Sequence, residues 1–236
     1  MPVFKGSWPV TNWVHQSGPV WRAFNWTNNS QQVFVNGRLL QQLGWPNDYV
    51  SRQACACWNW LYIPYGYSCN DINPATMTID VGNPSTNMPP WSFYYDAAST
   101  SLYMCLTNGF APASALVEVS TEPGIFFDNT VSGWLYLKGL TFLHSSTLTV
   151  TYFGWPNVIV SYNGIIEDCE VSWGDGYGLF VRSNSRVSRC RVNHNGIIGV
   201  NSSAHTNILI EDSFVLSNNV RECHQNYARA VGLIPN

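Results

Sequence analysis

The chain has 236 residues, of which 45% are hydrophobic and only 11% are charged, and its formal net charge is −3. This balance excludes the basic surface that binding to nucleic acid or to an anionic membrane requires, and no run of about 18 apolar residues predicts a membrane span. Eleven Trp and twelve Tyr suit a neutral, hydroxyl-rich ligand such as a sugar, whose C–H faces stack on aromatic rings.

The whole chain is predicted to be all-β. Gly, Pro, Asn and Ser separate short runs of Val, Ile, Tyr and Phe, and no segment shows the apolar period of about 3.6 residues that marks a helix. Residues 1–130 are expected to be a β-rich module that contains such runs within residues 32–40, 93–96, 102–106 and 117–119. The N-terminus lacks the apolar core of a signal peptide, but the composition favours a secreted or extracellular protein.

Residues 45–91 are expected to be a long aromatic insertion in this module. No charge occurs between Arg52 and Asp71, and aromatic residues dominate the segment. A loop of this length is usually functional or disordered, and the aromatic content opposes disorder. Trp58 and Trp60 are predicted to offer a stacking surface to a substrate; the alternative is that they form the small core of the loop itself.

The seven cysteines are an odd number, so at least one thiol has no partner within the chain. Cys55, Cys57 and Cys69 lack the spacing and the neighbouring His of a zinc site, so no metal ligand set is assigned. A disulfide from Cys69 to either Cys55 or Cys57 stays open. Cys169 and Cys190 are expected to be buried thiols that behave as small apolar side chains.

The second half of the chain, residues 131–236, contains an internal repeat followed by a C-terminal tail. Cys169, Cys190 and Ser213 occupy equivalent positions and recur at a nearly constant spacing. A period in the low twenties, with a strand, an Asn/Gly turn and a second short strand, is one coil of a β-solenoid. The repeating segments are Gly139–Phe142, Asp168–Val171, Arg189–Val192 and Asp212–Val215.

The alternation of side chains along each strand predicts which residues face inward. Cys169 and Cys190 should stack inside, as should the valines two positions later. The outward rows should form ladders of compensated charge, namely Asp168–Arg189–Asp212 and Glu170–Arg191. At the following turn, Asn195 and Asn218 should form an amide ladder.

The coil-forming segments resemble a known group of proteins. These segments are Ile165–Ser172, Gly176–Val181, Ser188–Gly196 and Ile208–Val215. They are similar to the right-handed parallel β-helix proteins of the pectate-lyase-like superfamily, which includes polysaccharide lyases, many glycoside hydrolases and uronan epimerases. The resemblance implies a right-handed parallel β-helix of few coils, with a polysaccharide bound in a groove on its outer face. The runs within residues 32–40, 93–96, 102–106 and 117–119 also resemble the lead-in of bacterial members, which implies that they are strands of a small β module before the coils.

In this interpretation the chain hydrolyses glycosidic bonds, because carboxylates are abundant and Lys5 and Lys138 are the only lysines. Asp168, Glu170 and Asp175 are the candidates for the acid and base groups of hydrolysis. Substrate binding is assigned to residues that stack on a sugar or orient it: Trp173, Arg191, His194, Arg182, Trp58 and Trp60.

Several alternatives stay open. A lyase or epimerase would use the carboxylates to hold Ca²⁺ and an Arg or Lys to abstract a proton, whereas hydrolysis implies no cofactor. A non-catalytic glycan-binding module, or an inactive fragment of a larger enzyme, would use the same groove. In the plainest interpretation the outward charges are only cross-strand ion pairs, and Asp175 only makes a tight turn.

The predicted partner is a polysaccharide or oligosaccharide, with no nucleic acid and no membrane. The ends of a solenoid are strand edges, which invite pairing between two copies of the chain. A homo-oligomer formed through these ends is therefore a further expectation.

Overall fold

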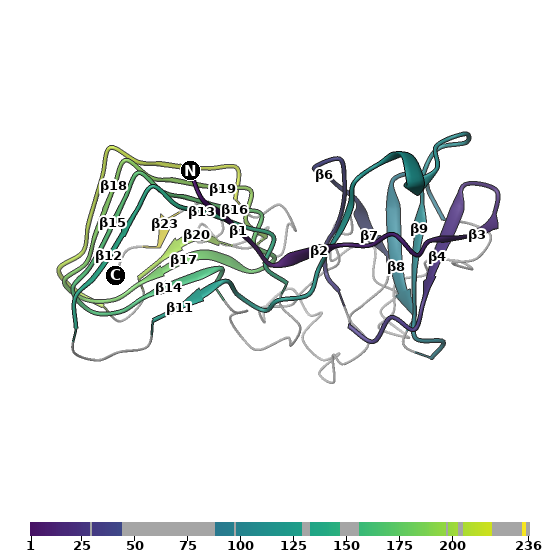
Figure 1. Ribbon diagram of the computed structural model, residues 1–236. Coiled ribbons are helices and arrows are strands. Elements are labelled where there is room, and N and C mark those ends of the chain that lie inside the picture. Colours follow the sequence, from purple (N-terminus) through teal and green to yellow (C-terminus); the bar gives the residue numbers. More distant parts are fainter. Residues whose placement is uncertain are drawn as a thin grey trace, which may run out of the picture. The chain divides into compact units, whose positions relative to one another are not determined.

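The computed structural model describes residues 1–28, 30–43, 88–96, 98–128, 133–146, 156–196, 198–202, 205–218 and 233–234. These residues form β-strands and one short 3-10 turn, Pro112–Ser114, and contain no α-helix. Among them, no helix is long and apolar enough to cross a membrane. The predicted all-β class is confirmed, and Figure 1 shows the strands in chain order. The aromatic insertion lies almost entirely outside the described residues.

The chain divides into two compact units. The coil unit comprises Met1–Gly6, Glu122–Thr147 and Thr151–Asn236, and the sandwich unit comprises Ser7–Thr121 and Leu148–Val150. The sequence predicted one module in residues 1–130 and the coils after it. In the structure, the first six residues and those from Glu122 onward, except Leu148–Val150, group with the coils.

The sandwich unit contains two sheets that share one core. One sheet has the order β2-β10-β5-β6 and the other the order β3-β4-β9-β8-β7. Their strands are β2 (Ser7–Pro9), β3 (Val14–Ser17), β4 (Val20–Phe24), β5 (Val33–Val35), β6 (Arg38–Leu39), β7 (Gln41–Leu43), β8 (Ser92–Asp96), β9 (Ser101–Cys105) and β10 (Val117–Ser120). The predicted strands within 32–40, 93–96, 102–106 and 117–119 correspond to β5, β6, β8, β9 and β10.

The sandwich core is formed by apolar side chains from both sheets. Val33 and Val119 of the four-stranded sheet and Phe93 and Leu102 of the five-stranded sheet are fully buried in a single cluster. Burial of each such side chain stabilises the folded state by about 1.5–3 kcal/mol, and this burial keeps the two sheets packed face to face.

The coil unit is a parallel β-helix built from three parallel sheets (Figure 1). The first sheet contains β1 (Val3–Lys5), β13 (Thr141–Leu143), β16 (Glu170–Ser172), β19 (Arg191–Asn193) and β22 (Phe214–Leu216). The second contains β12 (Leu135–Lys138), β15 (Gly164–Glu167), β18 (Arg186–Ser188) and β21 (Leu209–Glu211). The third contains β11 (Phe126–Phe127), β14 (Val158–Val160), β17 (Tyr177–Val181), β20 (Ile198–Asn201) and β23 (Leu233–Ile234).

The register of these sheets confirms the predicted repeat. Val171 pairs with Val192, and Val192 pairs in turn with Val215. The Arg191 backbone N–H donates to Cys169 O at 2.9 Å, so Cys169 and Cys190 occupy adjacent coils. Both cysteines are buried free thiols, as expected. The interior is a stack of Val, Ile, Leu and Phe side chains along all three sheets.

An N-terminal strand completes the first sheet, which the sequence did not indicate. β1 pairs in parallel with β13, from a distant part of the chain, so that Phe4 lies beside Phe142. The two rings stack with centroids 5.6 Å apart. Phe4 thereby covers part of the apolar end of the coils, and the sandwich unit is inserted in the sequence between β1 and β11.

Three corner ladders bend the coils, and each consists of residues with positive φ. The ladder between the second and first sheets is Gly139, Asp168, Arg189 and Asp212; the ladder after the first sheet is His144, Trp173, His194 and Ser217; and the ladder before the second sheet is Asn163, Asn184 and Asn207. This left-handed conformation is one that Gly, Asn and Asp adopt at least cost. A single such residue turns the chain sharply enough to begin the next sheet.

Candidate functional site

The structure places five of the predicted site residues on two adjacent strands of the first sheet and their corners. β16 carries Glu170 and ends at Trp173, and β19 carries Arg191 and ends at His194. Asp168 stands at the corner that precedes β16. We call this surface the β16–β19 face.

An aromatic stack borders the β16–β19 face. The rings of Trp173 and His194 lie nearly parallel, at an interplanar angle of 9°, with centroids 4.4 Å apart. Both residues are half-buried and adopt positive φ at the same corner of neighbouring coils. The backbone of the corner therefore holds the two rings in register.

Polar groups fill the strip beside this stack. Glu170 and Arg191 are partners in register, and so are Ser172 and Asn193. The Ser172 hydroxyl lies 2.9 Å from Glu170 Oε1 and also within hydrogen-bond distance of Asn193 Oδ1. A carboxylate, a guanidinium, a hydroxyl and an amide thus lie side by side next to two stacked rings.

Ion pairs occupy the corner on the other side of this strip. Arg189 donates from Nε to Asp168 Oδ1 at 2.8 Å and from Nη2 to Asp168 Oδ2 at 3.2 Å. This hydrogen bond and the charge of Arg189, with Lys138 3.7 Å away, lower the pKa of Asp168. Asp168 therefore stays ionised at neutral pH, which suits a base or a charge stabiliser and opposes a role as general acid.

The predicted charge ladders are present only in part. Asp168–Arg189 forms, but within the described residues Asp212 forms no ion pair, and no Glu170–Arg191 pair lies within ion-pair distance. Arg189 directs its guanidinium toward the preceding coil, where it reaches Asp168 and also Glu167, and not toward Asp212. The amide ladder is confirmed, since Asn195 Nδ2 donates to Asn218 Oδ1 at 3.0 Å.

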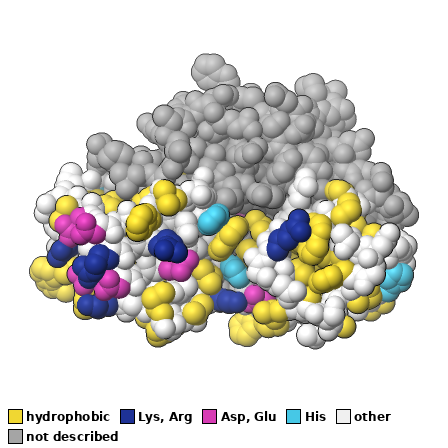
Figure 2. Space-filling model, turned by 90° about the horizontal axis from the view of Figure 1, so that it is seen from above, with side chains coloured by type: hydrophobic (Ala, Val, Ile, Leu, Met, Phe, Trp, Pro, Cys, Tyr) yellow, Lys and Arg dark blue, Asp and Glu magenta, His cyan; other side chains and the backbone are white. Residues whose placement is uncertain are grey.

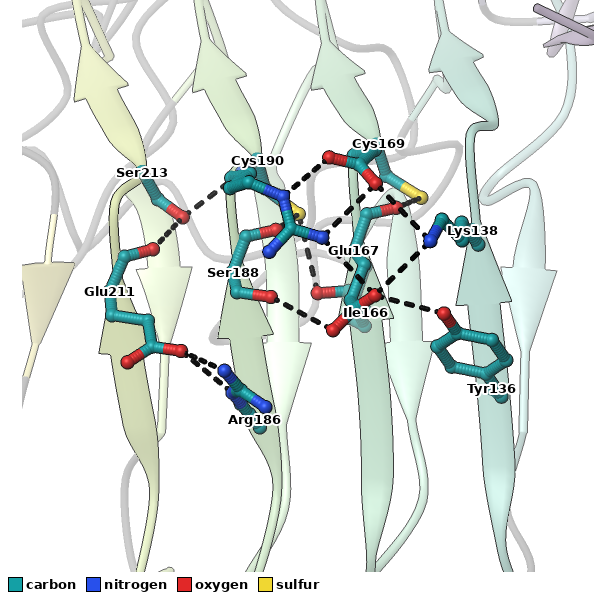
Figure 3. A network of polar contacts seen from close by, with 12 residues as sticks. Tyr136, Lys138, Ile166, Glu167, Cys169, Arg186, Ser188, Cys190, Glu211 and Ser213 are labelled. Atoms are coloured by element: carbon teal, nitrogen blue, oxygen red, sulfur yellow. Dashed lines mark hydrogen bonds and ion pairs between the residues drawn. The ribbon is translucent and has the colours of Figure 1, made fainter.

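Glu167 is the centre of a polar network that the sequence did not indicate (Figure 3). Its Oε2 accepts a hydrogen bond from the Tyr136 hydroxyl at 2.9 Å and lies 3.6 Å from Lys138 Nζ. Arg189 Nη2 reaches the same oxygen at 3.2 Å. The Tyr136 hydrogen bond, with the charges of Arg189 and Lys138, lowers the pKa of Glu167.

The longer connection after β12 concealed this network in the sequence. Tyr136 and Lys138 pair in register with Ile165 and Glu167, and their spacing is wider than that of the later coils. The outward direction of Glu167 could nonetheless have been predicted from the sequence, because side chains alternate along β15 and Ile166 is buried. Figure 2 shows several acidic and basic side chains close together at the left of the view, and others elsewhere on the same face.

Asp175 and Arg182 do not join the β16–β19 face. Asp175 is fully buried, and its backbone N–H donates to Ser145 O at 2.9 Å. Arg182 follows the far end of β17, where its guanidinium lies 5.7 Å from the centre of the Tyr162 ring. The predicted roles of these two residues stay predictions, and burial makes Asp175 the least accessible of the three carboxylates.

Arg182 belongs to a second aromatic cluster. The His205 ring contacts Tyr162 and Phe180 edge-on, with centroids 5.5 and 5.6 Å away. Burial and the charge of Arg182 lower the pKa of His205, which favours a neutral imidazole. This cluster lies at the opposite end of β17 from the Trp173 corner.

Trp58 and Trp60, together with Cys55, Cys57 and Cys69, lie outside the described residues. Within the described part of the chain, no group of three or more His, Cys, Asp or Glu side chains is arranged to hold a metal ion.

The fold and this face define the chain as a parallel β-helix protein with an inserted β-sandwich. Comparison with protein-family models and with curated protein sequences gives no match. Among solved structures, the chain is similar to XylC in complex with xylose, with a TM-score of 0.66 and 12% identity over 97% of this chain and 44% of that one. It is also similar to a glycoside hydrolase, with a TM-score of 0.58 and 10% identity over 89% of this chain and 63% of that one.

The chain thus spans less than half of XylC and 63% of the glycoside hydrolase. At these identities the similarity shows a shared fold. It extends over nearly the whole of the present chain, so it includes residues of both the coil unit and the sandwich unit.

Proposed function

We propose that the chain is a carbohydrate-active protein that binds a polysaccharide along the β16–β19 face and hydrolyses its glycosidic bonds there. The observation that carries this proposal is the Trp173–His194 stack beside Glu170 and Arg191. Aromatic rings contact the C–H faces of sugars, while carboxylate, guanidinium and amide groups bond to their hydroxyls.

Glu170 is the acid that we propose protonates the departing glycosidic oxygen. Asp168, which Arg189 keeps ionised, would activate water or stabilise the positive charge that develops on the sugar. Arg191 and His194 would orient the substrate, and Trp173 would stack on a sugar ring. An extracellular location follows from this proposal, because polysaccharides are met outside the cell.

The structural neighbours support the choice of substrate to test first. XylC was solved with xylose, and the second neighbour is a glycoside hydrolase. Xylan and short xylo-oligosaccharides are therefore the first ligands of a panel that also includes other neutral polysaccharides and polygalacturonate.

The test compares turnover and binding in two variants. Glu170→Gln is expected to lower the release of reducing ends by about 10²–10⁴-fold while binding is retained, because a general acid contributes that much. Glu211→Gln is the matched control, since Glu211 is paired with Arg186 at 2.7 Å on the second sheet. Absence of binding to every polysaccharide in the panel by the wild-type protein would overturn the proposal.

A non-catalytic glycan-binding module is the second candidate. The ion pairs of Asp168 and Glu167 favour it, because paired carboxylates are common as structural elements of a sheet face. Binding by the wild-type protein without release of reducing ends would decide for this candidate. Activity that requires Ca²⁺ and yields an unsaturated, ultraviolet-absorbing product would instead identify a lyase.

A further inference from the structure

The outer face of the second sheet presents two large aromatic rings to solvent. Trp134, directly before β12, is 82% exposed, and Tyr136 within β12 is 56% exposed. Leu137 between Tyr136 and Lys138 is buried in the core of the coils. The alternation therefore sends Trp134, Tyr136 and Lys138 to the same outer side.

Such exposure is unusual for these residue types, because Trp is highly buried on average in globular proteins. In the part of the chain that the structure describes, Trp134 has no hydrogen bond, ion pair or ring contact. Tyr136 is anchored only at its tip, where the hydroxyl donates to Glu167 Oε2 at 2.9 Å. The hydroxyl thus fixes the ring while most of its surface stays open.

The rest of the face continues this surface across four coils. Tyr136 pairs with Ile165, Ile165 with Arg186, and Arg186 with Leu209, which is 50% exposed. The charges on the face and its corner are balanced, with Lys138, Arg186 and Arg189 opposite Glu167, Asp168 and Glu211. A surface that combines open aromatic rings with internally paired charges suits an uncharged ligand.

We infer that Trp134 and Tyr136 form a second carbohydrate-binding platform, which takes consecutive sugar rings of a neutral polysaccharide. Two positions along a parallel strand separate their Cα atoms by about 6.6 Å, a distance comparable to the length of one pyranose unit. Each ring offers an aromatic face to the C–H face of a sugar, and Lys138 and Arg186 donate to hydroxyls. This inference rests on the proposed function, because it assumes that the chain binds glycans.

The platform is adjacent to the β16–β19 face around the corner that Asp168 and Arg189 form. A polymer bound at the platform would therefore raise the local concentration of substrate at the proposed acid. The platform contributes affinity for long chains, whereas the β16–β19 face performs the chemistry.

The test measures affinity for soluble xylan and glucomannan by affinity gel electrophoresis and calorimetry. Trp134→Ala and Tyr136→Ala are each expected to weaken binding about tenfold, the loss that one aromatic contact supplies. Tyr136→Phe keeps the ring and should weaken binding less than Tyr136→Ala does. Trp8→Ala is the matched control, since Trp8 is 61% exposed in the sandwich unit, and it should leave binding unchanged.

Thermal unfolding of each variant establishes that it is folded. Quenching of tryptophan fluorescence by acrylamide gives a second readout that does not depend on an affinity measurement. Addition of xylan should reduce the quenched fraction in the wild type, and the reduction should be smaller in Trp134→Phe. Both results together support the platform.

Failure of the platform can be distinguished from failure of the proposed function. If Trp173→Ala abolishes binding and both platform variants bind as the wild type does, the platform is overturned and the proposed function stands. If the wild type binds no polysaccharide, the proposed function and the platform are both overturned. If Trp134→Ala instead dissociates a dimer and leaves glycan binding intact, the occupant is a second copy and the inference is wrong. Preference for polygalacturonate over neutral polymers would likewise overturn it.

Discussion

Arg189 donates a hydrogen bond to Asp168 in the preceding coil, and the Nε–Oδ1 distance is 2.8 Å. Both residues adopt positive φ at the same corner of successive coils. The ion pair therefore exists because the two coils are in register, and it marks the edge shared by the first and second sheets.

Acid should weaken the coil unit through Glu167 and Asp168. The pKa of each carboxyl is lowered in the folded protein, by the Tyr136 hydrogen bond for Glu167 and by the Arg189 hydrogen bond for Asp168. A group with a lowered folded pKa stabilises the protein above its unfolded value, about 4, and this contribution is lost as the pH falls below that value.

The double variant Glu167→Gln with Asp168→Asn should therefore show a flatter fall of melting temperature between neutral pH and about pH 3 than the wild type. Asp212→Asn, a corner carboxylate without an ion pair in the described residues, is the control and should follow the wild-type curve. Parallel curves for the wild type and the double variant would show that the network does not act on stability.

Substitution in the buried amide ladder of Asn195 and Asn218 should destabilise the protein much more than substitution in the exposed ladder of Asn184 and Asn207. Asn195 is fully buried; its Nδ2 donates to Val171 O at 3.2 Å, and its Oδ1 accepts from the Gly174 N–H at 2.9 Å. Asn195→Asp removes the donor and buries a carboxyl against acceptor oxygens, which should cost about 3 kcal/mol or more.

The same substitution at the outer ladder is the control. Asn207 Nδ2 donates to Asn184 Oδ1 at 2.9 Å, but both residues are exposed. Asn207→Asp keeps a residue type that tolerates positive φ and should cost no more than about 0.5 kcal/mol. Urea unfolding measures both, and equal losses would contradict the difference in burial.

Two glycines of the coils should respond in opposite ways. A Cβ on Gly178 would lie 2.7 Å from Gly199 O and would collide with the Asn195 amide, so Gly178→Ala should cost about 1–3 kcal/mol. Gly139 has φ +64° with nothing within 4 Å of its Cβ position, and its ladder partners are Asp and Arg residues. Gly139→Asn should therefore stay within about 0.5 kcal/mol of the wild type, and a reversed order in urea unfolding would refute this account.

The sequence by itself determined the coils of residues 156–218. Strand, turn and inward residue recur there at a nearly constant spacing, and each of these signals is local, so the stacking of Cys169 on Cys190 and of Trp173 on His194 could be read from the spacing. Of the sandwich strands, β5, β6, β8, β9 and β10 correspond to predicted stretches, whereas β2, β3, β4 and β7 were not predicted.

Only the tertiary structure decided which distant segments complete these elements. β1 is short and carries no repeat signal, and its place beside β13 depends on a pairing between segments that lie far apart in the chain. The network around Glu167 depends on a coil with a different length, and the burial of Asp175 depends on how the turns pack. Periodicity specifies neighbours at a fixed spacing, whereas contacts across insertions of variable length are selected by packing of the whole chain.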